Sequence, residues 1–583
     1  MSILHILSLF GKNKNKKGLD FMDLKKVFND LFTWQGQENY DFELPESYSE
    51  NKVSTSDEDA NIVPKNIFPS VELNLEYIKT RYNTLINSDI IIREFNLLAR
   101  GKQYKAFLLF IDGMVDTDLI NNYVLKPLML RNSANTFDND EDRVISEAKT
   151  NNITVRKVKK FNILEHISSS LLPQNNVSEN ETFEELINGI NSGNCALFVD
   201  TLSVAFNIDV KGFKQRSVDS PKNELVIKGP HEAFVENVRT NTSLIRRIIN
   251  NENLIIQNIE VGNITKTKCA LIYMKDIASS DLVAEVEYRL NNLKVDSVLS
   301  AGELEQLISD SNDLGLPKAL STERPDTASR HLLQGRVIVI VNGTPFALIV
   351  PATLVDFLST PEDVNLKPGF ANFLKGIRFL AAAITLLLPG IYVAITSYHQ
   401  EIFPTELLFS ILASRENVPF PVIVEILAME IAFELIREAS LRVPSPIGST
   451  IGIVGALVIG EAAVSASIVS PTLIIIVAIT AIASSAIPDF SFGFHLRLFR
   501  FLFILLGYMA GFLGISLGLF VYISMIVNMK SFGLTTTIPF APYVRSKASK
   551  YFLPPIWKRE HRPAYLDPKI SKSQDNISMK WRY

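Results

Sequence analysis

Residues 453–469 read IVGALVIGEAAVSASIV, an apolar run in which Glu461 is the one charged side chain. A spanning helix needs roughly 20 apolar residues, and the candidate span 447–469, which contains this run, approaches that length. Three other runs in the last third of the chain do the same, namely 379–396, 471–487 and 501–527. Together they predict an α-helical polytopic membrane domain over residues 371–530, with about four spans. Because ionisable groups at bilayer depth are costly, Glu461 should be protonated, paired or facing a cavity.

One segment of this domain, residues 404–438, differs from the others because prolines, Arg415 and several glutamates interrupt its apolar residues. Residues 541–583 carry ten Lys or Arg against three Asp or Glu, a net charge of +7, and basic flanks favour the cytoplasmic side. Four spans put both ends of the chain in the cytoplasm, so we expect 404–438 to be a re-entrant or interfacial element buried against other helices. Five spans remain the alternative, because four would leave some arginines near the outer face, namely Arg437, Arg442, Arg497 and Arg500.

Within that segment, Glu430, Glu434 and Glu438 recur every four residues, so on a helix they line one face, with Glu425 off it. Two interpretations stay open. If this face borders water in a symmetric oligomer, each carboxylate becomes a ring, and acidic rings favour cations. If it does not, arginines pair with the glutamates at the membrane surface. The arginines considered for that pairing are Arg415, Arg437 and Arg442.

The chain ahead of the membrane domain is predicted to be an α/β soluble N-terminal region. Residues 1–66 are polar and are expected to be flexible. From 67 to 320, short apolar strands alternate with amphipathic helical stretches. Lys105–Ile111 followed by Asp118 resembles Lys268–Met274 followed by Asp281, which suggests two related subdomains. Their expected ranges are 67–170 and 180–320, and true duplication and chance similarity both remain open.

Two segments complete the predicted organisation. Residues 321–370 are expected to form a hairpin and a linker of the soluble region, because two apolar arms within 337–350 flank Asn342-Gly343, a strong hairpin signal. Residues 531–583 are predicted to be a basic cytoplasmic tail. Attraction to anionic lipid explains its charge better than nucleic acid does, since no groove-reading motif is present.

The search for catalytic chemistry is negative. The sequence has no GxxxxGK[ST], no strand-anchored GxGxxG, no HExxH and no GxSxG, and its seven histidines do not cluster. Asp116 and Asp118 are expected to cap a helix rather than to bind a metal. Cys195 and Cys269 lie in strand-like apolar runs and are expected to be buried, reduced thiols. The sequence therefore predicts a protein that is not an enzyme and that has no cofactor and no metal site.

Several segments spread over roughly residues 100–490 together resemble the A subunit of the spore germinant receptors of endospore-forming bacteria, the GerA family. Ser440 stands where glycine is expected in this family, and Glu461 where glutamine is common. The segments are KGPHEAFVE (228–236), LIRR (244–247), ERPD (323–326), GRV (335–337), VNGTPF (341–346), PED (361–363), LPGIYV (388–393), YHQE (398–401), ASRENVPFP (413–421), ELIREA (434–439) and IVGALVIG (453–460).

The resemblance implies a component of a complex in the spore inner membrane, together with a permease-like B subunit and a lipoprotein C subunit. It implies that a nutrient binds chiefly to the permease-like partner, and that the A subunit is a homo-oligomer forming an ion-conducting path. Candidate residues of that path are Glu430, Glu434, Glu438 and Glu461. A candidate surface for assembly or coupling comprises Gly229, Pro230, Glu232, Phe234, Glu236, Arg246 and Arg247. The alternative is a structural scaffold beside an ion-carrying partner.

Overall fold

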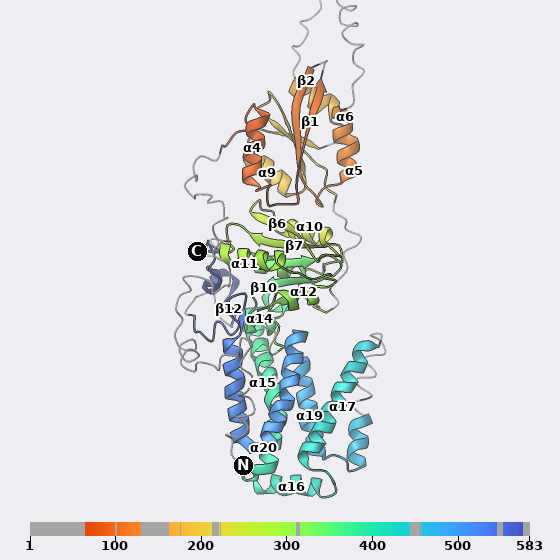
Figure 1. Ribbon diagram of the computed structural model, residues 1–583, viewed down its shortest axis with the longest axis vertical. Coiled ribbons are helices and arrows are strands. Elements are labelled where there is room, and N and C mark those ends of the chain that lie inside the picture. The colour runs from red at the N-terminus through yellow and green to blue at the C-terminus, as the bar shows by residue number, and fades with distance from the viewer. Residues whose placement is uncertain are drawn as a thin grey trace, which may run out of the picture.

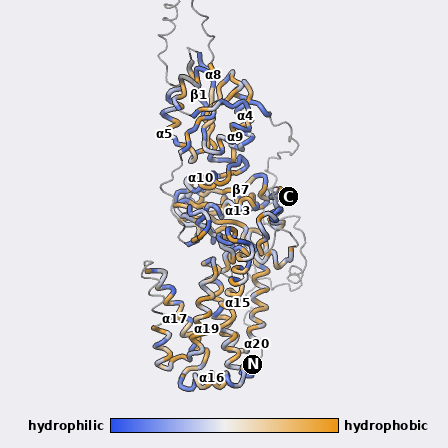
Figure 2. The backbone as a smooth tube through the Cα atoms, turned by 180° about the vertical axis from the view of Figure 1, so that it is seen from behind, coloured by the Kyte–Doolittle hydropathy of each residue, from blue (hydrophilic) through white to orange (hydrophobic). Residues whose placement is uncertain are grey.

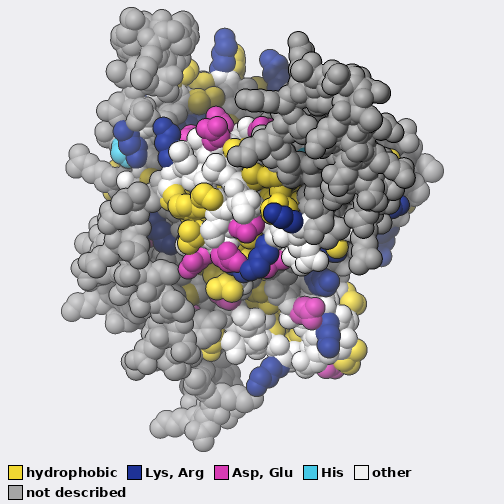
Figure 3. Space-filling view, turned by 90° about the horizontal axis from the view of Figure 1, so that it is seen from above, with side chains coloured by type: hydrophobic (Ala, Val, Ile, Leu, Met, Phe, Trp, Pro, Cys, Tyr) yellow, Lys and Arg dark blue, Asp and Glu magenta, His cyan; other side chains and the backbone are white. Residues whose placement is uncertain are grey.

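The computed structural model describes residues 64–99, 102–129, 163–174, 176–212, 221, 223–310, 315–443, 455, 458–544 and 552–574. The predicted flexible segment 1–66 therefore lies almost entirely outside the described residues. Figure 1 shows two α/β units stacked above a group of long helices. In Figure 2 these helices are the most continuously hydrophobic part of the chain. Seen from the end of the first unit, acidic and basic side chains are interspersed where they are visible (Figure 3).

The first unit is a five-stranded antiparallel sheet with strand order β1-β2-β4-β5-β3. Alternate side chains of β2 enter two different cores, with Phe107 and Leu109 on one face and Leu108 on the other. Its strands are β1 (Ile90–Ala99), β2 (Lys102–Ile111), β3 (Val177–Asn180), β4 (Cys195–Val199) and β5 (Ala205–Ile208). Its helices are α4 (Val71–Arg81), α5 (Thr117–Leu119), η2 (Ile120–Leu125), α6 (Lys126–Met129), α8 (Ile163–His166), η4 (Ile167–Leu171) and α9 (Phe183–Asn191).

The second unit repeats this plan with strand order β6-β7-β9-β10-β8. Val337, Val339 and Val341 of β9 enter the core beneath α11 and α12, while Ile338 and Ile340 enter the core beneath α10 and α13. Its strands are β6 (Leu254–Val261), β7 (Thr267–Met274), β8 (Leu320–Thr322), β9 (Val337–Val341) and β10 (Ala347–Val350). Its helices are α10 (Val238–Ile248), α11 (Ser280–Asn291), α12 (Ala301–Ile308) and α13 (Pro325–Leu332).

The two units share one topology, since the first to fifth strands of each occupy the same places in its sheet. The similar segments Lys105–Ile111 and Lys268–Met274 fall within β2 and β7, the second strand of each unit. The division differs from the predicted ranges: β3, β4 and β5 belong to the first sheet, so its strands continue to Ile208. Strand pairing between distant segments decides this boundary, and a local polar stretch is a poor guide to it.

Several smaller predictions are confirmed. The hairpin is formed by β9 and β10, which pair antiparallel around Asn342-Gly343, although it belongs to the second sheet rather than to a linker. Asp116 caps α5 by accepting from the backbone N–H groups of Asp118 and Leu119. Cys195 and Cys269 are buried and free, and burial raises the pKa of Cys269 to about 12.

The helical region follows the second unit. Its elements are α15 (Pro368–Tyr398), α16 (Thr405–Arg415), α17 (Val422–Arg442), α19 (Pro471–Ser485) and α20 (Phe490–Asn528). Two of these described helices, α15 and α20, are long and apolar enough to cross a membrane. Segment 404–438, predicted to be a re-entrant or interfacial element buried against other helices, contains two helices: α16 lies across the far end of the group, whereas α17 runs lengthwise beside α19 (Figure 1). The physical reason is that Ile426 and Met429 of α17 pack into a core shared with α15 and α19.

The expected single span 501–527 is also wrong, because α20 turns back on itself. Gly511 has φ +58° and ψ −139°, a conformation reserved for glycine, and helical geometry is interrupted there. The two arms then lie side by side, with the His495 ring nitrogen 3.1 Å from the Tyr522 hydroxyl. Close backbone contact holds the first arm against α15, since a Cβ on Gly507 would lie 2.5 Å from the Gly390 carbonyl oxygen.

The chain after α20 returns to the second unit, and we call its described residues 529–544 and 552–574 the C-terminal strap. Ser531 donates from its hydroxyl to the Lys318 carbonyl at 2.5 Å, and Phe532 lies in the core of the second sheet. Arg562 donates to the Leu333 carbonyl at 2.8 Å. The strap includes β11 (Lys530–Ser531), β12 (Leu534–Thr535), η8 (Ile556–Lys558) and η9 (Ala564–Leu566). The predicted basic tail is thus partly a folded element of the soluble region.

Candidate functional site

The glutamate face of α17 meets two arginines of α20. Glu430 and Arg500 are almost fully buried, and a carboxylate oxygen of Glu430 lies 2.7 Å from a guanidinium nitrogen of Arg500. Glu434 lies 3.1 Å from Arg497 and 3.3 Å from Arg437. Glu430 and Glu434 are four residues apart on α17, and Arg497 and Arg500 are three apart on α20. Residues at these spacings lie on one face of a helix, so the glutamates and the arginines meet at one interface. The result is a network of two carboxylates and three guanidinium groups.

This network has energetic consequences. Each charge has left water, so its partner must compensate for the lost hydration. Removing one member of a buried pair typically costs roughly 3–5 kcal/mol, since the other charge is left uncompensated. Compensation within the described residues is incomplete, because Oε1 of Glu430 and Nε of Arg500 are buried and have no hydrogen-bond partner among them. The interface between α17 and α20 therefore holds a strong ion pair whose two members each keep an unused hydrogen-bonding atom.

The other two glutamates of α17 are also paired. Glu425 is buried, lies 3.1 Å from Arg415 of α16 and accepts from the backbone N–H of Ser470 at 3.1 Å. Glu438 is exposed and pairs with Arg442 at 2.5 Å, one turn further along the same helix. The sequence correctly suggested Arg415, Arg437 and Arg442 as partners. It missed the buried partners Arg497 and Arg500, which only the packing of α20 against α17 reveals.

Glu461 is different, because its side chain is exposed and forms no hydrogen bond or ion pair with another described residue. It lies in the helical residues 458–465, which pack against α17 and α19 through Ala463 and Val464. Val458, an apolar residue three positions before Glu461 on the same helix, is 56% exposed. An isolated carboxylate therefore stands on an apolar edge of the helical group.

The predicted coupling segment lies at the junction of the two α/β units. Arg246 of α10 donates from Nε to Asp89 at 2.8 Å and from Nη2 to the same carboxylate at 3.0 Å. Both side chains are 2% exposed. Asp89 comes directly before β1, and Arg246 also donates to Asn87 at 3.1 Å. One buried guanidinium thus joins the first unit to the second.

The other residues of that segment lie within or beside the second unit rather than at the junction. Arg247 pairs with Glu232, and Phe234 is buried in the core beneath α10. Pro230 and Glu236 contribute backbone carbonyls, which accept from Arg324 Nη2 and from the backbone N–H of Gly343, both at 2.7 Å. Gly229 lies beside Asn365 of the linker. Among the described hydrogen bonds of these residues, those of Arg246 reach the first unit.

Among the residues that the structure describes, no group of three or more His, Cys, Asp or Glu is arranged to hold a metal ion.

Comparison with known proteins adds independent information. A family model described as Bacillus/Clostridium GerA spore germination protein matches residues 76–565. The chain is 36% identical over 515 residues to spore germination protein KA of Bacillus subtilis (strain 168), covering 88% of this chain and 90% of that protein. It is 37% identical over 475 residues to spore germination protein B1 of the same organism, covering 81% and 92%.

A solved structure is also similar. The crystal structure of the N-terminal domain of the A subunit of the Bacillus megaterium spore germinant receptor GerK3 is 30% identical to this chain, with a TM-score of 0.37. The match covers 50% of this chain and 97% of that domain.

Proposed function

The chain belongs to the GerA family of spore germination proteins, and from this membership we propose that it is the A subunit of a nutrient-sensing germinant receptor whose copies assemble into a gated cation path. In this proposal the complex lies in the spore inner membrane with a permease-like B subunit and a lipoprotein C subunit. The chain crosses that membrane several times, and its soluble region and strap face the cytoplasm. A nutrient bound at a partner shifts the oligomer from closed to open.

The proposal that this chain conducts cations rests on the exposed position of Glu461. A carboxylate at the apolar edge of a membrane helix is costly unless water or another subunit covers it. In a symmetric oligomer one copy from each subunit forms an acidic ring, which attracts cations. Exposed apolar residues of the helical group, including Val458 at 56% and Ile431 of α17 at 52%, supply surface for contact between copies.

Glu430 and Glu434 have a different proposed role, that of a closed-state contact. Their charges are matched by Arg497 and Arg500, so they offer a cation little attraction while α17 and α20 remain together. Separation of these helices would expose both carboxylates. Glu438, exposed and paired with Arg442, extends the same face toward the end of α17. A nutrient signal that moved α17 would then change the charge presented to ions.

A structural scaffold remains the second candidate, and the arginine partners of Glu425, Glu430, Glu434 and Glu438 favour it. In that case the permease-like partner alone carries ions, and the acids hold helices together. The two proposals differ in what a purified chain does in a lipid vesicle.

The test is monovalent cation flux in liposomes containing the full chain, alone and with its partner subunits and nutrient. Glu461→Gln should lower flux several-fold, because it removes the ring charge and keeps the side-chain shape. Glu461→Lys should reduce cation flux at least tenfold, since a basic ring repels cations. Glu94→Lys, at an exposed site on β1, is the matched charge reversal and should leave flux unchanged.

Two results would contradict conduction by this chain. One is the absence of flux with partners and nutrient present, combined with flux from the permease-like partner alone. The other is unaltered flux and germination after replacement of Glu430, Glu434 and Glu461 together by glutamine.

A further inference from the structure

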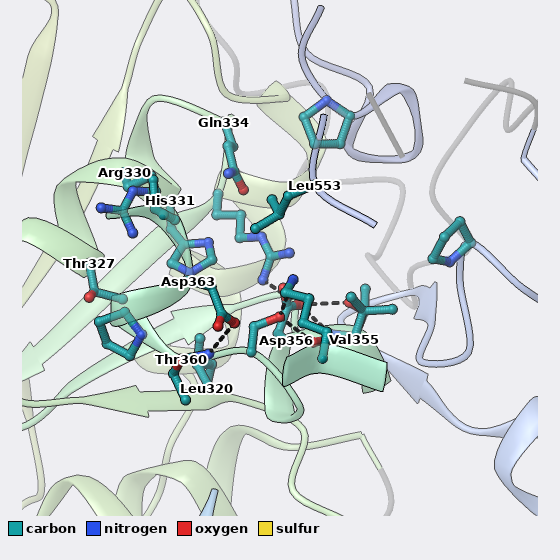
Figure 4. A pocket seen from close by; sticks show the side chains of 18 of the residues that line it. Leu320, Thr327, Arg330, His331, Gln334, Val355, Asp356, Thr360, Asp363 and Leu553 are labelled. Atoms are coloured by element: carbon teal, nitrogen blue, oxygen red, sulfur yellow. Dashed lines mark hydrogen bonds and ion pairs between the residues drawn. The ribbon is translucent and has the colours of Figure 1, made fainter. Parts of the chain in front are cut away.

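A cavity of about 180 Å³ lies where the soluble region joins the helices. Its walls come from α13, from the linker helices α14 (Leu354–Phe357) and η6 (Pro361–Val364), from the start of α15 and from the strap. Figure 4 shows Arg330 and His331 of α13 on one side of this space and the linker residue Asp356 on another. The volume is below the roughly 300–1,000 Å³ typical of drug-sized ligands, so the space suits a small ion or metabolite.

The acidic groups of the linker are already occupied. Asp356 lies 2.8 Å from Arg336 and accepts from the backbone N–H and hydroxyl of Thr353 at 2.8 and 2.7 Å. Asp363 accepts from two guanidinium nitrogens of Arg378 at 2.7 and 2.9 Å and from the Thr360 N–H at 3.0 Å. Both carboxylates have thus satisfied their charge and most of their acceptor capacity within the fold.

The groups on the cavity walls that can still form hydrogen bonds are mainly donors. Arg330 lines the cavity and forms no hydrogen bond or ion pair with another described residue. The Thr327 hydroxyl and the Arg336 Nε have no hydrogen-bond partner among the described residues, and the two residues are 6% and 1% exposed. Buried donors without acceptors are costly, and groups left in this state call for a ligand, an ion or water.

We propose that this junction cavity binds a small oxyanion, a carboxylate or phosphate group, through Arg330, Thr327 and Arg336. An oxyanion offers several acceptors in a plane or tetrahedron, which matches the forked donors of a guanidinium. The ligand would contact the second sheet, the linker and the strap at once. The site lies outside the proposed ion path, and its existence does not depend on conduction.

The titratable groups on the walls are compatible with a bound anion. Burial lowers the pKa of His331 to about 3, so its ring is neutral and does not compete as a charge. Burial raises the pKa of the Glu224 carboxyl to about 7, so this group is partly protonated near neutrality. Lys375 of α15, 4% exposed, adds a positive charge near the Ser359 hydroxyl at 2.9 Å.

The experiment is isothermal titration of the detergent-solubilised full chain with inorganic phosphate and, separately, with acetate, at ionic strength fixed with sodium chloride. Saturable binding of either anion is the expected result. Arg330→Gln and Thr327→Val should each weaken binding, the first at least tenfold. Arg330→Lys should restore part of it, because it keeps the charge and loses the fork. Arg93→Gln, at an exposed site on β1, should bind as the parent does.

The outcomes separate clearly. Binding of phosphate alone identifies a phosphate-bearing ligand, and binding of acetate alone identifies a carboxylate. No saturable heat with either anion, in a chain whose circular dichroism spectrum is that of folded protein, would overturn the proposal. Binding that persists unchanged in both Arg330→Gln and Thr327→Val would overturn it as well.

Discussion

Glu224 has an environment that makes the junction sensitive to pH. Its carboxylate accepts from the Thr322 hydroxyl at 2.6 Å and from the Glu323 N–H at 3.2 Å. Burial raises its pKa to about 7 from an ordinary value of 4.5. The neutral form is therefore preferred in the folded chain, and the stability it contributes is lost as pH rises from about 4.5 through 7. Charged groups around it are Glu323, Arg324, Arg330, Arg336, Lys375, Asp356 and Asp363, with His331.

Glu224→Gln should remove this loss. Relative to the parent chain, the variant should gain stability between pH 5 and 7 and keep a constant advantage above pH 7, of up to about 3 kcal/mol. His331 acts in the opposite direction below pH 6.5, because its folded pKa is about 3, but it is the same in both chains and cancels in the difference. Thermal unfolding of the solubilised chain at four pH values measures the difference. The exposed-site variant Glu94→Gln should differ from the parent by the same stability at every pH. The same pH-independent difference for Glu224→Gln would contradict the raised pKa of Glu224.

The glutamates of α17 show what a residue pattern can and cannot predict. Spacing of four was sufficient to place Glu430 and Glu434 on one face, and the nearby Arg437 was a correct local partner. Arg500 lies 70 positions from Glu430 in sequence, and its pairing depends on how α20 packs against α17. Periodicity describes one helix at a time, so a partner on another helix is invisible to it.

Helices and strands could be predicted from the sequence where the pattern that specifies them lies within a few neighbouring residues. The β9–β10 hairpin follows from two apolar arms and an Asn-Gly turn, and the structure confirms it. The similar strands β2 and β7 correctly suggested related units, yet the strand order that defines each sheet rests on pairings far apart in the chain. The turn inside α20 was missed, because an unbroken apolar run is equally typical of one long helix and of two short ones.

Gly511→Ala tests that turn. A side chain at φ +58° and ψ −139° is strained, and the new Cβ would lie 2.7 Å from the His399 ring. We expect a loss of roughly 1–3 kcal/mol, seen as a lower thermal midpoint in detergent. Gly369→Ala is the matched control, because that helical glycine has open space around its Cβ position. Equal midpoints for the two variants would show that α20 does not turn at Gly511.

At the scale of the whole molecule, the Arg246–Asp89 pair connects the two α/β units. Asp89→Ala would leave a guanidinium that is 2% exposed without its carboxylate, and should cost roughly 3–5 kcal/mol. We also expect calorimetry of the full chain to resolve an earlier transition for the first unit.

The control for this prediction crosses the same junction. Arg81 of α4 pairs with Glu252 at 2.5 Å, but its side chain is 38% exposed. Arg81→Gln should therefore cost less than about 1 kcal/mol, because solvent screens such pairs. A loss for Asp89→Ala no larger than that for Arg81→Gln would show that the buried pair does not hold the units together.

The strap has a consequence for how the chain is made. Phe532 is 1% exposed in the core of the second sheet, with Arg289 stacked 4.4 Å from its ring and Asp310 accepting from its N–H at 2.7 Å. The ribosome releases residue 532 only after every helix from α15 to α20. During synthesis the core of the second unit therefore lacks Phe532 until the helices have been made and the chain has returned to this unit. The core of the second unit can therefore be completed only after the helical region has been synthesised.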